Sequence, residues 1–266
     1  MAASPWPPQG PWRIAMASSV GTAHLAAAQP CQDAYFHLEA VDAEGQPVLV
    51  LAAADGAGTA ERADIGALLA CETFARLVAA YLEQGGRVEA IGRLLAERWI
   101  AGIVYRLELQ TRQTRAALRD YACTLLVAVV GAKGSVFMQI GDGAMVIHNG
   151  IGWQYVFWPQ HGEFANTTTF VTSDRAAQAM EFLRLGAPVE ELALFTDGIE
   201  NLVLHKASKT VHAPFFDSVF TPVRKSTASG VDAGLSRALE AYLSGPTIND
   251  RTDDDKTLIL ASRKRA

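Results

Sequence analysis

Cysteine is scarce in this chain of 266 residues. Its three cysteines, Cys31, Cys71 and Cys123, are odd in number, far apart and not arranged as a Cys-x-x-Cys pair. The pattern therefore excludes a disulfide framework and a cysteine-based zinc site. Such sparse cysteine usage is typical of a reducing compartment, and we expect the protein to be cytoplasmic.

Excess positive charge and long apolar runs are also missing. The 23 Lys and Arg residues are outnumbered by 28 Asp and Glu residues, so the net charge is -5 and no basic footprint for nucleic acid exists. No apolar run approaches the ~18 residues of a membrane span. The N-terminus lacks the charged and apolar regions of a signal peptide. We expect a soluble protein without a nucleic-acid or membrane partner.

Apolar residues recur along the chain with the spacings that are typical of strands and helices. Residues 1–11 contain four prolines and are expected to form a flexible arm before a single domain at 12–266. The spacing of apolar residues predicts strands at 12–20, 33–39, 47–54, 123–130, 135–140, 144–148, 153–158, 167–171, 191–196 and 256–261, and helices at 60–83, 88–112, 215–220 and 231–243. The stretch 203–212 has no clear period and is expected to be a loop.

The order of these elements indicates the fold class. Strands, two helices, a run of strands, further helices and a last strand follow one another without regular βαβ alternation, which makes a doubly wound parallel sheet a poor fit. The short glycine-containing turns at 131–134 and 141–143 favour antiparallel neighbours. We therefore expect an α+β fold built on mostly antiparallel sheets.

Aspartates stand beside the ends of apolar runs in distant parts of the chain. They are Asp33, Asp55, Asp142, Asp197 and the group Asp253, Asp254 and Asp255. A buried carboxylate is costly unless a positive charge compensates it. One such Asp is usually a turn residue, but several from distant segments suggest a shared cation. Oxygen-only ligands suit Mg²⁺ or Mn²⁺, and two such ions can activate a water that bridges them.

Five motifs carry a family resemblance. They are Cys31-Gln32-Asp33, Asp55-Gly56-Ala57-Gly58, Cys123-Thr124-Leu125 followed by Gly141-Asp142-Gly143, Thr196-Asp197-Gly198, and Asp254-Asp255-Lys256-Thr257. In type and order they resemble the metal-dependent protein phosphatases of type 2C, the PPM family, over about residues 12–262. The chain looks like a divergent bacterial-type member. The resemblance implies an α-β-β-α sandwich of two mostly antiparallel sheets flanked by helices.

The same resemblance implies roles for individual residues. Asp55 would bridge two Mn²⁺ or Mg²⁺ ions, and the Gly56 carbonyl would ligate one of them. Asp197 and Asp254 would hold the ion nearer the C-terminal motifs, while Asp33 would act through water. A hydroxide bridging the two ions would attack the phosphorus atom, so Asp55 and Asp33 are the expected catalytic residues.

Asp142 has two readings. With Asp197 it could bind a weaker third ion, although the family's further acidic ligand for that ion is Asn201 here. Alternatively, the Gly-Asp-Gly segment is a plain hairpin turn. Asp253 and Asp255, which flank the expected ligand Asp254, are expected to be solvated. The alternative is a one-residue slip, in which one of these neighbours takes the place of Asp254.

The phosphate-binding half of the family's site has changed. Ala28 stands where many members carry an arginine that grips the phosphate, and Ala57 replaces the His of the Asp-Gly-His motif. Candidate phosphate contacts are His24, which is equally well a surface or capping histidine, and Arg62, which is more often an exposed helix residue.

The function expected from the resemblance is hydrolysis of phosphoserine or phosphothreonine in proteins. The partners would be phosphoprotein substrates and a cognate Ser/Thr kinase or its targets. The changed phosphate grip motivates one alternative, a catalytically weak or inactive pseudophosphatase that binds phosphoproteins or a kinase. The retained aspartates oppose that alternative.

Overall fold

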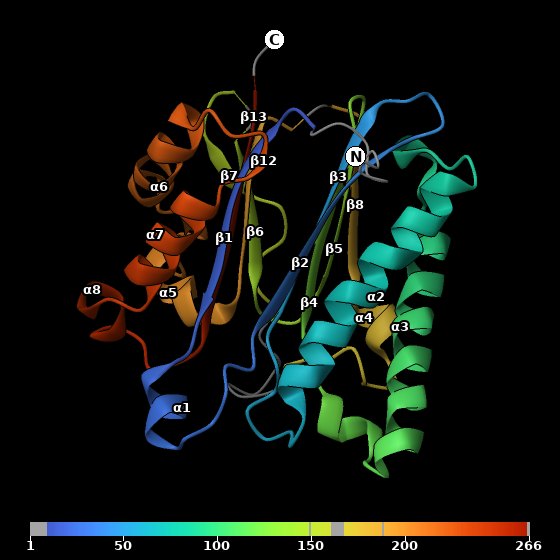
Figure 1. Cartoon of the computed structure of the whole chain (residues 1–266), viewed down its shortest axis with the longest axis vertical. Coiled ribbons are helices and arrows are strands. Elements are labelled where there is room, and N and C mark those ends of the chain that lie inside the picture. Colours follow the sequence, from blue (N-terminus) through green and yellow to red (C-terminus); the bar gives the residue numbers. More distant parts are fainter. Residues whose placement is uncertain (1–9, 149, 161–167, 188, 265–266) are drawn as a thin grey trace, which may run out of the picture.

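Two β-sheets packed face to face form the centre of the molecule in the computed structural model, which describes residues 10–148, 150–160, 168–187 and 189–264 (Figure 1). One sheet has the order β12-β1-β13-β9-β6-β7 and the other β2-β3-β4-β5-β8. The strands of the first are Gly230–Val231, Trp12–Ser19, Lys256–Arg263, Glu191–Phe195, Ala144–His148 and Trp153–Tyr155 in that order. Those of the second are Ala34–Val41, Pro47–Ala54, Leu125–Val130, Ser135–Ile140 and Glu181–Leu185. Only β1 and β12 pair in parallel among the described strands.

Helices cover the outer face of each sheet. The five-stranded sheet carries α2 (Ala63–Glu83) and α3 (Arg93–Thr114), and the six-stranded sheet carries α6 (Ala213–Lys225) and α7 (Ala233–Leu243) (Figure 1). Shorter helices are α1 (Thr22–Ala26), α4 (Ala176–Ala179), α5 (Glu200–Val203) and α8 (Pro246–Asn249), with 3-10 turns η1 (Val88–Ala90), η2 (Leu118–Tyr121) and η3 (Asp197–Ile199). The expected α-β-β-α sandwich is confirmed.

Strand β3 shows how the sequence produces this layering. Side chains alternate between the two faces of a strand. Leu49, Leu51 and Ala53 accordingly pack between the two sheets, while Val48 and Val50 pack with the residues under α2 and α3. All five are buried. A strand buried on both faces needs the continuous apolar run 47–54, as the sequence indicates.

Helix α2 is the one described helix that is long and apolar enough, by length and composition, to cross a membrane. Half of its most apolar window is buried inside the protein. Ala67, Cys71, Phe74 and Val78, spaced three or four residues apart, form its buried face beneath the five-stranded sheet. The core helix of a folded domain has a similarly apolar composition, because the face that packs against the rest of the protein is apolar.

The turn at 141–143 does not form the expected hairpin. Strand β5 belongs to the five-stranded sheet and β6 to the six-stranded one, so Gly-Asp-Gly carries the chain from one layer to the other. Gly141 has a φ of 102°, and a Cβ there would lie 2.5 Å from Thr124 Cγ2. A Cβ at Gly143 would lie 2.8 Å from Leu126 Cδ1. Glycine is needed at both positions because the chain passes close to neighbouring side chains as it crosses from one sheet to the other. The prediction that Gly-Asp-Gly forms a hairpin turn is wrong.

Several other element predictions need correction. Residues 203–212 are not a loop, because β10 (Leu204–His205) pairs with β11 (Thr210–Val211). The strand expected at 167–171 is absent from residues 168–171, and residue 167 lies outside the described residues. The helix expected at 88–112 is divided into η1 and α3, and only 153–155 of the strand at 153–158 forms. Short elements such as β8 and α1 have too little periodic sequence to be predicted.

Residues 1–9 of the expected N-terminal arm lie outside the described residues. Its last two residues are attached to the domain. The Gly10 N–H donates to Glu39 Oε2 at 2.7 Å, and the Pro11 carbonyl accepts from Lys264 N at 2.6 Å. The helix expected at 215–220 extends over Ala213–Lys225, and the one at 231–243 begins at Ala233, where Asp232 Oδ1 accepts from Gly234 N and Leu235 N.

Candidate metal centre

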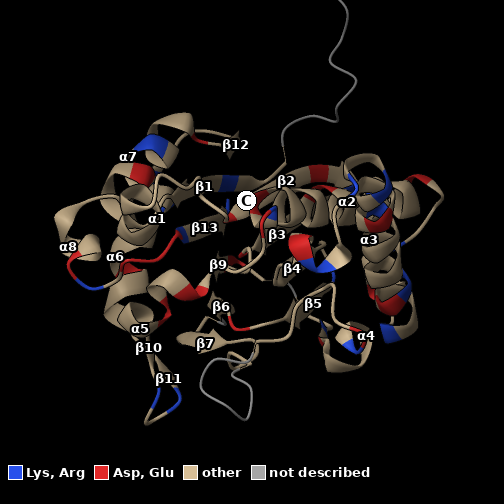
Figure 2. Ribbon diagram, turned by 90° about the horizontal axis from the view of Figure 1, so that it is seen from below, with Lys and Arg blue, Asp and Glu red and all other residues tan. Residues whose placement is uncertain are grey.

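Both sheets contribute aspartates to one end of the sandwich. Asp55 follows β3, Asp142 lies in the crossing between β5 and β6, and Asp197 follows β9. Asp254 precedes β13 and Asp33 precedes β2. Figure 2, which views the molecule from below, shows acidic segments near the ends of β9, β4 and β6. The aspartates that are scattered in the sequence therefore meet where strands from both layers end.

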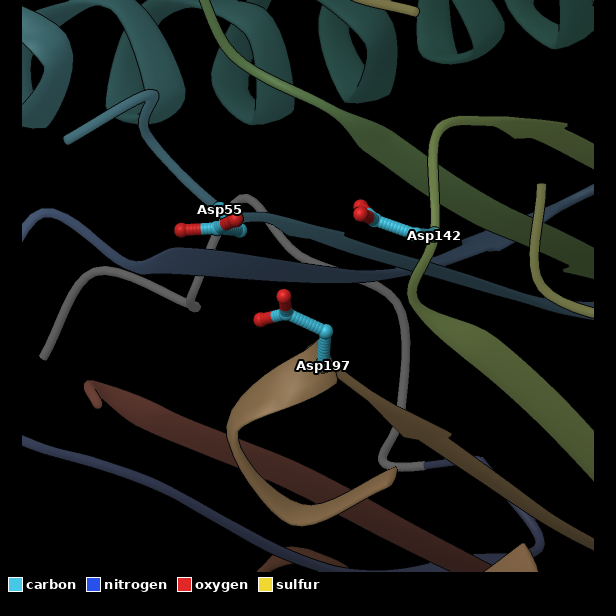
Figure 3. A group of neighbouring side chains, drawn as sticks. All are labelled: Asp55, Asp142 and Asp197. Carbon is cyan, nitrogen blue, oxygen red and sulfur yellow. The ribbon is translucent and has the colours of Figure 1, made fainter. Parts of the chain in front are cut away.

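Asp55, Asp142 and Asp197 form the centre of this group. One carboxylate oxygen from each lies within 4.8 Å of the others, and the side chains of Asp142 and Asp197 point toward Asp55 (Figure 3). A six-coordinate Mg²⁺ with oxygens at about 2.1 Å holds opposite ligands about 4.2 Å apart. Small side-chain movements would therefore let these three oxygens share one hard cation. The oxygen-only donor set fits such an ion.

Asp55 and Gly56 are fixed by the neighbouring strand. The Asp55 N–H donates to Thr124 Oγ1 at 2.9 Å, and the Asp55 carbonyl accepts from Thr124 N at 2.8 Å. A Cβ at Gly56 would lie 2.7 Å from the Gln32 carbonyl oxygen. Only glycine fits this turn, because it brings the backbone of the Asp55 motif against the segment that leads to Asp33.

Asp33 is buried between two threonines. Its Oδ2 accepts from Thr196 Oγ1 and from Thr257 Oγ1, each at 2.7 Å. Its Oδ1 is buried and has no hydrogen-bond partner among the described residues. An unpartnered buried carboxylate oxygen is costly, and a cation or an ordered water is the usual way in which it is satisfied. The role of Asp33 beside a metal ion stays a prediction.

Asp142 and Asp254 complete the acidic group. Asp142 Oδ2 accepts a hydrogen bond from Thr168 Oγ1. Asp254 Oδ1 accepts from the Asp255 N–H at 2.8 Å. Together with Asp197, both line a cavity of 390 Å³, which we call the acidic cavity. Its other lining residues are Gly198, Glu200, Asn201, Leu202, Lys206, Arg251, Thr252 and Asp253.

Burial and mutual repulsion raise the pKa values of Asp33, Asp55 and Asp197. The pKa of Asp55 is raised well above its usual range by burial and then by the charges of Asp33, Asp197, Asp254 and Asp142. Burial, with the charges of Asp142 and Asp254, raises the pKa of Asp197 to about 8. Burial raises the pKa of Asp33 to about 7, although the two threonine hydroxyls oppose the shift. Without a cation, Asp33, Asp55 and Asp197 therefore keep their protons to a higher pH than an ordinary aspartate does.

Asp255 is buried, which corrects the expectation that it is solvated. Only 2% of it is exposed, whereas Asp253 is exposed as expected. Asp255 Oδ1 accepts from Gly21 N at 2.6 Å. Its Oδ2 accepts from Gln32 N at 2.5 Å and from His24 Nδ1 at 2.8 Å. These three bonds attach the segment that precedes Asp33 to the start of β13, beside Asp254.

The predicted phosphate contacts are placed outside the acidic cavity. His24 binds Asp255 through Nδ1, so only Nε2 remains for another partner. Arg62 lies just before α2, where its backbone N–H donates to the Asp120 carbonyl. Neither residue lines the acidic cavity, and their contact with phosphate stays a prediction. Ala57 packs in a small apolar cluster with Ala60, Ala63, Ala122 and Phe170.

Sequence reasoning missed two cations of the acidic cavity, Lys206 and Arg251. Lys206 Nζ lies 3.5 Å from Glu200 Oε1. The Arg251 guanidinium is exposed and makes no hydrogen bond or ion pair within the described part of the chain. Neither residue belongs to a family motif. Arg251 lies three residues before Asp254 in the sequence, while Lys206 reaches the cavity through the fold.

Comparisons with known proteins identify the family of this chain. The family model described as protein phosphatase 2C matches residues 20–244. Serine/threonine-protein phosphatase 3 of Escherichia coli (strain K12) is 38% identical over 253 residues, which cover 94% of this chain and 98% of that protein. The chain therefore belongs to the protein phosphatase 2C family, which is metal-dependent.

Solved structures share the fold at low sequence identity. The serine/threonine phosphatase Stp1 from Staphylococcus aureus has a TM-score of 0.59 at 14% identity, with 98% of each chain covered. PppA, described as a regulatory component of the T6SS in Pseudomonas aeruginosa, has a TM-score of 0.60 at 16% identity, with 95% of this chain and 97% of that chain covered. At this level of identity, they support the two-sheet architecture alone.

The substitution Asp255→Asn tests the network around the site. An amide can present only one acceptor oxygen to the three donors of Asp255, so at least one buried N–H loses its partner. We expect a loss of about 1–3 kcal/mol in the free energy of unfolding, measured by urea denaturation. Asp253→Asn removes a neighbouring exposed carboxylate and should change stability by less than about 0.5 kcal/mol. Equal effects of the two substitutions would contradict this role of Asp255.

The raised pKa values predict how pH affects the metal-free protein. The pKa of an unfolded Asp is about 3.9. In the folded state, the pKa is about 7 for Asp33 and about 8 for Asp197. Between these values the folded state binds more protons, so its stability falls as pH rises. In EDTA, we expect the melting temperature to fall between about pH 5 and about pH 8, and Mn²⁺ to reduce that fall.

The variant Asp197→Asn provides the control for this pH dependence. Because it removes one carboxyl group with a raised pKa, its melting temperature in EDTA should fall less over the same pH range. If wild type and variant have parallel profiles with and without Mn²⁺, the cluster does not control the pH dependence.

Proposed function

We propose that this protein hydrolyses phosphoserine or phosphothreonine side chains of phosphoproteins at the acidic cavity. The observation that carries the proposal is the meeting of Asp55, Asp142 and Asp197 oxygens within 4.8 Å, contributed by three separate elements. Membership of the protein phosphatase 2C family supports it. No observation favours a non-catalytic binding module, and the retained aspartates speak against one.

The protein's own groups would divide the work as follows. Asp55, Asp197 and Asp254 hold the divalent ions with the Gly56 carbonyl, Asp33 acts beside them through water, and Asp142 serves a weaker further ion. When bound, two Mn²⁺ or Mg²⁺ ions polarise the phosphoryl oxygens and supply the attacking water in its activated form. Asn201 lines the cavity next to Asp142 and Asp197 and offers that further ion a neutral ligand.

The phosphate grip is proposed to come from Arg251. It replaces the arginine that the family has at the position of Ala28, whose backbone here adopts a φ of 53°. A guanidinium presents two parallel N–H donors to phosphate oxygens, and that of Arg251 is not engaged by another described residue. Lys206 is less available, because it faces Glu200. His24 and Arg62 are the weaker candidates.

The cellular setting follows from the same chemistry. All three cysteines are free, which supports a reducing cytoplasm as the place of action. The substrates would be phosphoproteins made by a cognate Ser/Thr kinase. We further propose that residues 12–266 act as a single catalytic domain.

Asp55→Asn tests the catalytic claim. Because Asp55 stands at the centre of the carboxylate group, its loss should lower the hydrolysis of p-nitrophenyl phosphate with Mn²⁺ by at least about a hundredfold. Calorimetry should show weakened Mn²⁺ binding at the same time. Asp64→Asn, at the start of α2, removes an acidic group of the same charge without touching the site and should retain activity. A wild type without turnover, indistinguishable from Asp55→Asn, would contradict the proposal.

Arg251→Gln tests the phosphate grip. Loss of the guanidinium should raise KM for a phosphoserine peptide by about tenfold or more, the value of one charge-assisted hydrogen bond. Arg251→Lys, which keeps the charge without the paired donors, should be intermediate. Arg237→Gln on α7 removes an exposed arginine away from the cavity and serves as the control. An unchanged KM in Arg251→Gln would assign the grip to another group.

A further inference from the structure

A second cavity lies among the helices on the outer face of the six-stranded sheet. It has a volume of 440 Å³ and lies between α6, α7 and α8. We call it the apolar groove, because side chains such as Val219, Leu235, Leu239, Tyr242 and Ile248 line it. Its size is within the range of about 300–1,000 Å³ that proteins use for ligands. The metal centre does not use it.

The apolar groove and the acidic cavity are neighbours. Leu202 and Arg251 line both. Leu202 lies in α5, which begins three residues after Asp197, and Arg251 follows α8. Figure 1 shows α5 and α8 toward the end of the sandwich where α1 also lies. A molecule whose phosphoryl group occupies the acidic cavity can therefore reach the groove by passing Arg251.

We propose that the apolar groove binds an apolar side chain of the phosphoprotein substrate, a few residues from the phosphorylated serine or threonine. This inference rests on the proposed function. The occupant must join a phosphoryl group to an apolar group, and a phosphorylated peptide segment with a nearby leucine or aromatic residue has both. The groove's continuity with the acidic cavity favours the substrate itself over a separate ligand.

The composition of the groove supports this occupant. Among the described residues that line it, the ionisable side chains are His212, Tyr242 and Arg251. Arg251 lies where the groove meets the acidic cavity. An acidic or basic side chain of the substrate would lose its hydration there without a partner, whereas an apolar one would gain. The groove therefore selects substrates by an apolar side chain at a fixed spacing from the phosphoresidue.

Phosphoserine peptides test the inference. One leucine is moved through five positions on each side of the phosphoserine in an otherwise alanine background. With Mn²⁺ present, kcat/KM should rise by about tenfold for leucine at one or two adjacent positions, mainly through KM. Release of inorganic phosphate gives the rates.

Two tryptophan substitutions on α7 give the matched variants. Ala238 is exposed and lines the groove, whereas Ala241 is exposed on the same helix and does not. Ala238→Trp should fill the groove and remove the preference for leucine, so that all peptides react at the rate of the alanine peptide. Ala241→Trp should keep the preference. Circular dichroism confirms that both variants fold, and Ser218→Trp on α6 gives a second way to fill the groove.

The outcomes separate this inference from the function on which it rests. No positional preference in the wild type, or a preference that survives both groove-filling substitutions, would overturn it. A change in sedimentation with Ala238→Trp, without a change in peptide preference, would assign the groove to a second copy of the chain and also overturn it. If the wild type hydrolyses neither p-nitrophenyl phosphate nor any phosphopeptide, the proposed function has failed instead.

Discussion

Mutual repulsion among closely placed, buried and half-buried carboxylates is the constraint on which this end of the molecule depends. Asp33, Asp55 and Asp197 are held close together, and burial with neighbouring charge raises all three pKa values. Groups that repel one another stay together only if the surrounding structure holds them. The two packed sheets hold these residues, because each aspartate stands next to a strand whose apolar side chains are packed in the core. A divalent cation turns the same arrangement into an attractive one.

Neutral donors hold the acidic side chains in place. Threonine hydroxyls bind Asp33, a threonine hydroxyl also holds the Asp55 backbone, and backbone N–H groups bind Asp255. Such donors orient a carboxylate without neutralising its charge. An arginine or a lysine in the same place would neutralise it. Protons or cations are therefore left to compensate the charge of Asp33, Asp55 and Asp197. The positive side chains Lys206 and Arg251 stand apart from this network, at the wall of the cavity where a phosphoryl group would enter.

Much of the fold could be predicted from the sequence, because the apolar runs at 47–54 and 192–195 have to be core strands in any arrangement. The order of the aspartate motifs likewise predicted which residues meet. The rest depends on contacts that no local pattern contains. A Gly-Asp-Gly segment can form either a hairpin turn or a crossing between sheets, so its sequence does not distinguish the two. Asp255 is buried only because N–H groups of Gly21 and Gln32 reach it. Arg251 stands just before the last motif, but only the fold shows that it lines the cavity with Asp142 and Asp197.

The crossing at 141–143 has a mechanical consequence. Asp55 belongs to one sheet, Asp197 to the other, and Asp142 to the segment that joins them. Divalent ions held among these residues would fasten the two layers together at one end of the sandwich, while the apolar side chains between the sheets hold the remainder. Loss of the ions would then loosen the layers from that end. Withholding such ions would therefore lower the stability of the folded protein as well as any hydrolysis at this end of the sandwich.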